Sequence, residues 1–466
     1  MLADATSGEG SLRRRSANVT TFHFSVEAYQ SKAAFLLAPC IGERSASGPG
    51  KVPPHKPVSD IAGVALRTDA NLVNAWGIAF SPTGPIWIAD NGTGVATVYQ
   101  SDGQSFPLGS PLVVMIPPPN GGQPPVAPTG TVFNGTAGFV VSANSHSGPS
   151  LFIFVTEDGT ISGWSPGVDL KNAILVVDNS APGGVDNSTL GAVYKALAIA
   201  QEGSQTFIYA ANFRDAIVEK YDSNFKLVKA FADTNVPTGF APFGIREIHG
   251  RLFVTFALQN DKKHDDVSGA GNGFVEILEV DGTFHRFASQ GTLNSPWGLA
   301  ESPRTFGKFS DAILVGNFGD GRINAFDEAG NFLGQLHDEL GQPMTINGLW
   351  GLTFGNGALA GKRNHLFFTA GIGDEGHGLF GVIRKAGAED IEEDLEYPGS
   401  TRGGYESPHP ADRKPTQVRG WYRGHYLGPV KYVSVSLPPI NPLMPYPHPR
   451  ASTTCPVLLV SWRGQS

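Results

Sequence analysis

Two short stretches of the chain combine imidazole and carboxylate side chains. The first stretch contains His264, Asp265 and Asp266, and the second contains Asp374, Glu375 and His377. Histidine is the natural general base near neutral pH, because its ordinary pKa is about 6.5. Imidazole with carboxylate also suits zinc, whereas carboxylate with amide oxygen suits calcium. His264 and His377 are therefore candidate catalytic residues and candidate metal ligands.

Other polar side chains follow strand-like runs or immediately precede them. Three of them, with the two histidines, form the candidate metal set: Asp90, Asn212 and Asn317. The candidate ligand-binding residues are Asp265, Asp266, Asp374, Glu375, Arg214, Asn294 and Asn347. No dense metal motif such as His-Glu-x-x-His is present. The alternative interpretation is structural, because Asp and Asn are ordinary residues of turns and strand ends.

A repeated aromatic–glycine pair indicates the fold that must position these side chains. The pairs are Trp76-Gly77, Phe243-Gly244, Trp297-Gly298 and Trp350-Gly351. The last three are separated by 54 and 53 residues. The same step forward from Trp76 reaches Gly130, and the same step back from Phe243 reaches the segment near Tyr194. The repeat therefore predicts six units between about residues 70 and 385.

Each unit contains short strand-like runs and lacks the 3.6-residue apolar rhythm of helices. A repeat of this length made of strands is typical of propeller blades, which have four antiparallel strands each. We expect an all-β, six-bladed propeller over residues 58–385, with poorly ordered flanks at residues 1–57 and 386–466. The tryptophans are expected to pack the blades. The stretch 61–66 is predicted to close the ring as the outermost strand of blade six.

Blade geometry predicts where the polar residues gather. The loop between the second and third strands lies on the same side as the loop that precedes the innermost strand. The polar side chains of both loops should therefore converge around one mouth of the central channel. The loop at residues 258–272 is far longer than a hairpin needs, and loops of that length are usually functional or disordered.

Composition excludes some functions. A net charge of −8 and a pI near 5.8 argue against non-specific nucleic-acid binding, which needs a basic surface. The sequence contains no apolar run long enough for a membrane-spanning helix. The proline-rich segment 386–466 is predicted to be disordered. Both cysteines, Cys40 and Cys455, lie in the flanks and leave the redox compartment open.

Several longer strings resemble a known family. They are Asn71–Pro82, Asp261–Val267, Leu293–Leu299, Gly316–Ile323 and Gly373–Gly381. The chain is similar, over about residues 58–383, to an uncharacterised and mostly bacterial family of NHL-like six-bladed propellers. Some members carry a PEP-CTERM sorting signal, so the resemblance implies a secreted or extracytoplasmic protein. This chain shows neither that tail nor a clear signal peptide.

Two functions remain open at this level. The first is a binding or scaffold propeller, expected to be monomeric, whose polar loop face recognises a protein, a glycan or a small molecule. The alternative is a metal-dependent hydrolase resembling the six-bladed calcium lactonases. Asp90, Asn212 and Asn317 would then hold a divalent cation, calcium or zinc, with His264 or His377 as the general base. Whether the protein is an enzyme stays undecided.

Overall fold

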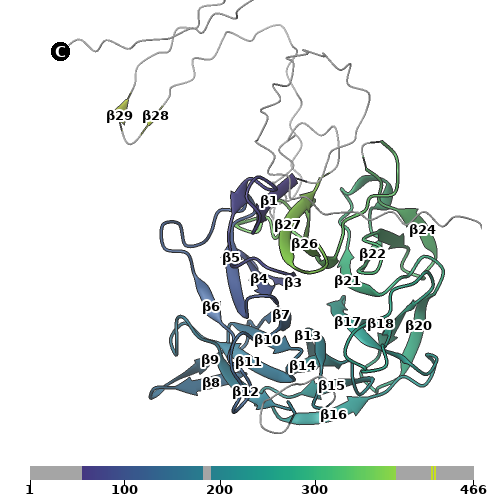
Figure 1. The fold of residues 1–466 in the computed structure, drawn as a ribbon, viewed down its shortest axis with the longest axis horizontal. Coiled ribbons are helices and arrows are strands. Elements are labelled where there is room, and N and C mark those ends of the chain that lie inside the picture. The colour runs from purple at the N-terminus through teal and green to yellow at the C-terminus, as the bar shows by residue number, and fades with distance from the viewer. Residues whose placement is uncertain (1–54, 182–189, 339, 385–420, 423–424, 427–466) are drawn as a thin grey trace, which may run out of the picture. The chain divides into compact units, whose positions relative to one another are not determined.

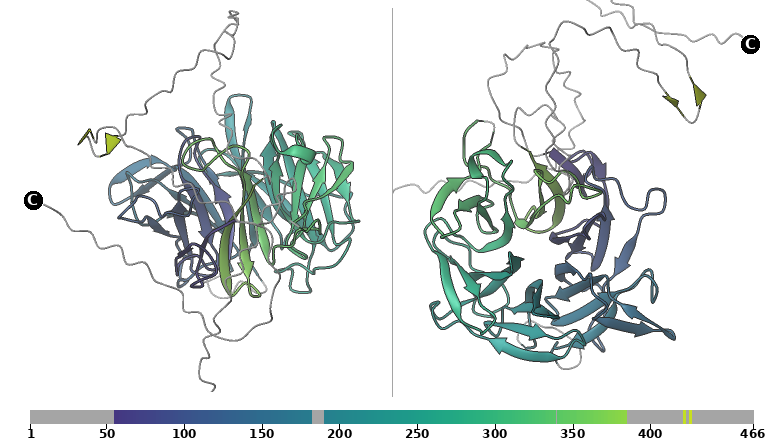
Figure 2. Two further views of the ribbon diagram at one scale, coloured as in Figure 1. Left: turned by 90° about the horizontal axis from the view of Figure 1, so that it is seen from above. Right: turned by 180° about the vertical axis from the view of Figure 1, so that it is seen from behind.

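Six β-sheets surround one axis in the computed structural model, which describes residues 55–181, 190–338, 340–384, 421–422 and 425–426. Figure 1 shows the sheets as a ring with their innermost strands around the centre, and Figure 2 shows the ring from the edge and from behind. The only helical element among the described residues is one 3₁₀ turn, Gly307–Phe309. The predicted all-β, six-bladed propeller is confirmed.

Each blade follows the previous one along the chain, and its strands run antiparallel from the axis outward. Blade 1 contains β3 (Ala75–Ala79), β4 (Ile86–Asp90), β5 (Val95–Tyr99) and β6 (Val113–Met115). Blade 2 contains β7 (Pro128–Phe133), β10 (Phe152–Thr156), β11 (Thr160–Trp164) and β12 (Ile174–Asp178). Blade 3 contains β13 (Tyr194–Glu202), β14 (Gln205–Asn212), β15 (Ile217–Tyr221) and β16 (Leu227–Phe231).

The second half of the ring repeats the pattern. Blade 4 contains β17 (Phe240–Ile248), β18 (Arg251–Leu258), β19 (Gly273–Leu278) and β20 (Phe284–Ser289). Blade 5 contains β21 (Pro296–Glu301), β22 (Ile313–Asn317), β23 (Ile323–Phe326) and β24 (Phe332–Gln335). Blade 6 begins with β25 (Leu349–Phe354), β26 (Leu366–Ile372) and β27 (His377–Ile383). Its outer strand comes from the beginning of the described chain.

That outer strand is β1 (His55–Ser59), which pairs antiparallel with β27 and parallel with β2 (Arg67–Thr68). A strand ahead of blade 1 therefore closes the ring, but the prediction that residues 61–66 form it is wrong. Those residues form a turn around Gly63, whose φ is +80°, and Leu66 is exposed. The prediction followed the apolar run at residues 61–66. The strand that closes the ring is instead β1, in which the Val58 side chain is fully buried.

The aromatic–glycine pairs lie where the innermost strands slip out of register with their neighbours. Such β-bulges re-aim side chains, here toward the axis. Glycine follows the aromatic residue because the backbone of the next blade fills its side-chain position. A Cβ on Gly244 would lie 2.1 Å from the carbonyl oxygen of Trp297, and one on Gly298 would lie 2.4 Å from that of Trp350. The backbones of neighbouring blades therefore crowd together near the axis.

Three tryptophans from different blades meet at the axis. The rings of Trp76 and Trp350 stack with centroids 3.6 Å apart, and Trp297 packs edge-on against both. Phe243 and Phe318 also contact the Trp350 ring, at centroid distances of 5.9 and 3.9 Å. The tryptophans are packing residues as predicted, although they join blades across the ring. We call Trp76, Phe243, Trp297 and Trp350 the aromatic layer.

Some features lie outside the six-blade pattern. A hairpin of β8 (Val140–Ala143) and β9 (His146–Pro149) is inserted between β7 and β10, and the sequence did not predict it. Two further strands, β28 (Trp421–Tyr422) and β29 (His425–Tyr426), pair with each other in a separate unit, residues 395–466. The rest of that proline-rich segment and residues 1–54 lie outside the described residues. No helix in the described part could span a membrane.

Candidate functional site

A lysine occupies the position in blade 3 that the aromatic residue holds in four other blades. Lys195-Ala196 follows the start of β13 as Trp76-Gly77 follows the start of β3, with the same break in register. The Lys195 side chain is 3 % exposed. Its backbone carbonyl accepts a 3.0 Å hydrogen bond from the Trp297 indole. The sequence analysis missed this residue, although alignment of the six repeats would have revealed a lysine among aromatic residues.

The Lys195 ammonium lies between two carboxylates. It donates a short hydrogen bond to Glu157, in the turn between β10 and β11, and its Nζ lies 3.4 Å from Oδ1 of Asp265. It also lies 5.3 Å from the Trp76 ring centroid and 5.8 Å from that of Phe213, within reach of cation–π attraction. Burial disfavours the ammonium, but the two carboxylates outweigh burial and raise the pKa of Lys195. Lys195 is therefore protonated at neutral pH.

Amide side chains extend this network around the channel mouth. Glu157 accepts a 3.0 Å hydrogen bond from Asn91, and Asn91 accepts one of 3.1 Å from Asn74. Asn74 also donates to Glu375 at 2.8 Å and accepts a 3.1 Å bond from the Trp350 indole. Loops of blades 1, 2, 3, 4 and 6 are thus connected by hydrogen bonds at one end of the channel. We call the set the rim cluster: Asn74, Asn91, Glu157, Lys195, His264, Asp265 and Glu375.

His264 and Asp265 come from the long loop of blade 4 between β18 and β19, as the sequence indicated. The His264 Nδ1 atom lies 2.7 Å from Oδ1 of Asp265. One ligand atom from each of Glu157, His264 and Asp265 lies within 4.8 Å of the others, a spacing that could hold a metal ion. The bond from His264, with the charge of Lys195, lowers the pKa of Asp265 well below its ordinary value. Asp265 is therefore a carboxylate at neutral pH.

Two other acidic residues of this region behave in the opposite way. Burial raises the pKa of Glu375, and the charge of Glu157 adds to that rise. Burial also raises the pKa of Asp266, which neighbours Asp265 and bonds to the Ser268 hydroxyl at 3.2 Å. Carboxylates a few residues apart thus have pKa values displaced in opposite directions. The hydrogen bond from His264 is the main cause for Asp265, whereas burial is the main cause for Asp266 and Glu375.

The three candidate metal ligands at strand ends bond within their own blades. Asp90 accepts a 2.8 Å bond from Thr97, Asn212 donates to Glu219 at 2.9 Å, and Asn317 donates to Asp320 at 2.9 Å. Burial raises the pKa of Asp90 well above its ordinary value. These bonds cross the hairpins between the second and third strands, while one oxygen each of Asp90 and Asn317 is buried without a hydrogen-bond partner among the described residues.

The remaining candidates lie in separate places. The His377 Nδ1 atom lies 2.6 Å from Asp60, where β27 meets β1, so His377 belongs to the ring closure. Arg214 donates to the carbonyls of Leu190 and Gly191, and Asn294 accepts a 2.7 Å bond from the Gly269 amide. Asp374 and Asn347 are exposed in turns. The structure brings together His264, Asp265 and Glu375 from the predicted set, and adds Lys195, Glu157, Asn74 and Asn91.

Comparison with known proteins places the chain among viral relatives. It is 33% identical to uncharacterized protein R648 of Acanthamoeba polyphaga mimivirus over 336 residues, covering 70% of this chain and 79% of that protein. It is 29% identical to uncharacterized protein L690 of the same virus, covering 69% and 83%. No family model matches the chain. These relatives are viral, whereas the resemblance in the sequence strings pointed to a mostly bacterial family.

Solved structures show a distant likeness. A virginiamycin B lyase from Staphylococcus aureus is 12% identical with a TM-score of 0.40, covering 67% of this chain and 97% of that one. A gluconolactonase from Xanthomonas campestris is 14% identical with a TM-score of 0.40, covering 73% and 99%. Likeness at this level carries no information about function.

Proposed function

Because the chain belongs to the family of the mimivirus protein R648, whose name assigns no chemistry, we propose a function from the site itself. The protein is a binding propeller whose rim cluster holds a cationic group of a partner. The observation that carries this proposal is the Lys195 ammonium between Glu157 and Asp265. This internal ion pair supports the proposal, because the spacing of the two carboxylates suits an organic cation.

Charge and exposure support a cationic partner. The rim cluster contains three carboxylates, those of Glu157, Asp265 and Glu375, against one lysine, so its acidic groups exceed the charge of Lys195. The Asp265 side chain is 59 % exposed and can accept a second donor from solvent. Guanidinium and carboxylate pair through two parallel hydrogen bonds, and complementary charge favours the correct encounter. A basic peptide segment is therefore the partner that this end of the channel fits best.

A labelled hexa-arginine peptide tests this function by fluorescence anisotropy. We expect binding to the full chain that weakens as salt is added, because exposed charges are screened. Asp265→Asn should weaken binding by about tenfold, the usual effect of removing one charge-assisted hydrogen bond. The matched control is Asp311→Asn, an exposed carboxylate in the loop between β21 and β22, which should bind as the parent does. Equal affinity of parent and Asp265→Asn, or equal binding of hexa-glutamate, would overturn the proposal.

A metal-dependent hydrolase is the second candidate, because Glu157, His264 and Asp265 have suitable spacing for a divalent cation. In that case the three side chains would hold the ion, which would supply polarisation of a carbonyl group. The position of Lys195 favours the binding function instead. A metal ion held by all three side chains would have to displace the ammonium from Glu157 and Asp265, whereas a peptide guanidinium needs only the exposed face of Asp265.

A further inference from the structure

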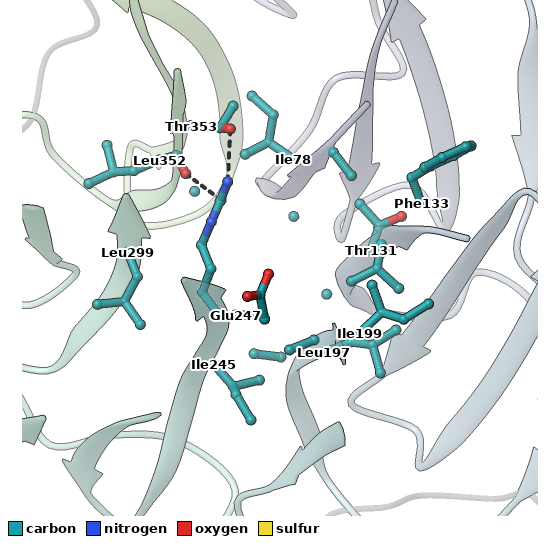
Figure 3. Close-up of a pocket in the computed structure, with 18 of the residues that line it drawn as sticks. Ile78, Thr131, Phe133, Leu197, Ile199, Ile245, Glu247, Leu299, Leu352 and Thr353 are labelled. Carbon is teal, nitrogen blue, oxygen red and sulfur yellow. Dashed lines mark hydrogen bonds between the residues drawn. The ribbon is translucent and has the colours of Figure 1, made fainter. Parts of the chain in front are cut away.

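A cavity of about 380 Å³ lies on the other side of the aromatic layer from the rim cluster. Along each innermost strand, most residues that line the cavity come after the aromatic–glycine position. Of the rim residues, Asn74 comes before that position in blade 1, and Lys195 takes the place of the aromatic residue in blade 3. The walls are mostly aliphatic, as Figure 3 shows: Ile78, Leu197, Ile199, Ile245, Leu299 and Leu352. The cavity size falls in the range of about 300–1,000 Å³ that small-molecule sites occupy.

Arg246 of β17 brings a positive charge into these apolar walls. Its guanidinium donates to the backbone carbonyl of Leu352 at 3.0 Å and to the Thr353 hydroxyl at 3.1 Å, the bonds dashed in Figure 3. Both acceptors are uncharged. Among the described residues, no carboxylate lies within salt-bridge distance of it. A guanidinium has five N–H donors, so this one retains donors for a ligand.

The other charged residue of the lining is Glu247, which Figure 3 shows turned toward the cavity. Its carboxylate accepts a hydrogen bond from the Gly250 amide, in the turn that joins β17 to β18. One carboxylate oxygen of Glu247 is therefore already paired within its own hairpin. Burial lowers the pKa of Arg246, and Glu247 partly offsets that effect. A partly buried charge without a carboxylate in salt-bridge contact is costly, and a bound anion would relieve the cost.

We propose that this cavity binds a small organic carboxylate with an apolar body. The carboxylate accepts hydrogen bonds from the Arg246 guanidinium, and the apolar body packs against the aliphatic side chains of Leu197, Ile199 and Leu299. Apolar burial supplies affinity in such a site, and the few polar groups fix the orientation of the ligand. The proposal concerns the opposite end of the channel from the rim cluster and does not depend on the function proposed there.

Isothermal titration calorimetry with 4-methylpentanoate tests the proposal, with 4-methylpentan-1-ol as the uncharged probe of the same shape. We expect the acid to bind more tightly than the alcohol. Arg246→Met should weaken binding of the acid by about tenfold or more, since it removes charge-assisted hydrogen bonds. The matched control is Arg304→Met, which removes the same charge from an exposed loop and should leave binding unchanged.

A second variant keeps the proposal testable if Arg246→Met does not fold. Ile199→Phe keeps the guanidinium and fills part of the cavity, so it should abolish binding while the far-ultraviolet circular dichroism spectrum stays unchanged. Equal affinity for acid and alcohol, or unchanged binding of the acid to folded Arg246→Met or to Ile199→Phe, would overturn the proposal. 4-Methylpentan-1-amine has the same apolar body and carries an ammonium in place of the carboxylate. Tighter binding of this amine than of the acid would overturn the carboxylate class and show that Glu247 receives a cation.

Discussion

The two ends of the central channel differ in how their buried charges are balanced. At the rim, the Lys195 ammonium contacts the carboxylates of Glu157 and Asp265. In the cavity, the Arg246 guanidinium bonds only to uncharged oxygens among the described residues. The aromatic layer lies between the two regions. The same six innermost strands therefore present a charged, hydrogen-bonded surface at one end and an apolar chamber with an incompletely paired cation at the other.

This difference follows from the local sequence of each innermost strand. In blades 1, 5 and 6 the loop before the aromatic–glycine position carries an amide side chain, from Asn74, Asn294 and Asn347. Residues after that position lie within strands, where aliphatic side chains predominate. Lys195 lies at the boundary, where its ammonium is within cation–π distance of the Trp76 ring and bonds to Glu157 at the rim. The presence of Lys195 in blade 3, where four other blades have an aromatic residue, thus sets the charge balance of the rim.

The largest expected effect is on stability at the rim. Lys195→Met leaves Glu157, whose side chain is 13 % exposed, without its cation. Removing one partner of a buried ion pair usually costs about 3–5 kcal/mol in the free energy of unfolding. Because the pKa of Lys195 is raised above 10.5, this stabilisation is present below pH 10.5 and is lost as the pH rises through the folded-state value. Urea unfolding at pH 7 measures the loss.

The cavity variant Arg246→Met provides the comparison for that measurement. It removes hydrogen bonds to uncharged oxygens and strands no carboxylate, so the cost should be nearer about 1–2 kcal/mol. Lys262→Met, an exposed lysine in the loop that carries His264, should stay within about 0.5 kcal/mol of the parent. A larger loss for Arg246→Met than for Lys195→Met would contradict the contrast between the two ends.

A smaller effect should distinguish Glu375 from the other rim carboxylates. Its pKa is raised by burial, so the folded state favours the protonated form, and stability falls as the pH rises above about 4.5. Glu375→Gln keeps an acceptor for Asn74 and removes the charge. We expect this variant to gain under about 1 kcal/mol at pH 7 and nothing at pH 4. Destabilisation at pH 7 would show instead that the negative charge of Glu375 supports the network.

The sequence predicted the six-bladed fold because the aromatic–glycine spacing records a real constraint. The crowded axis excludes a Cβ after each aromatic residue, as Gly244 and Gly298 show. The sequence-based prediction misplaced the closing strand. It followed the apolar run at residues 61–66, whereas the strand that closes the ring is β1, which contains the buried Val58. The inserted hairpin β8–β9 had no counterpart in the repeat, so its period gave no signal there.

The candidate site was less predictable for a physical reason. The structure brings His264, Asp265 and Glu375 from the predicted set into one cluster, whereas Asp90 and Asn317, residues of the same types, bond across the hairpins of their own blades. The rim cluster differs from these hairpins because the long Lys195 side chain contacts residues of two other blades. Spacing along the chain cannot show that Lys195 contacts Glu157 and Asp265, because these contacts span 38 and 70 residues.

The most direct test of the account is whether the Lys195 ammonium replaces a metal ion at the rim. Zinc and calcium titrations by calorimetry should show no binding to the parent chain at the rim, and His264→Ala should not alter the result. Lys195→Met should gain zinc affinity, because Glu157, His264 and Asp265 then face one another without a cation. Stoichiometric zinc or calcium binding to the parent, lost in His264→Ala, would contradict the account and favour the metal-dependent hydrolase.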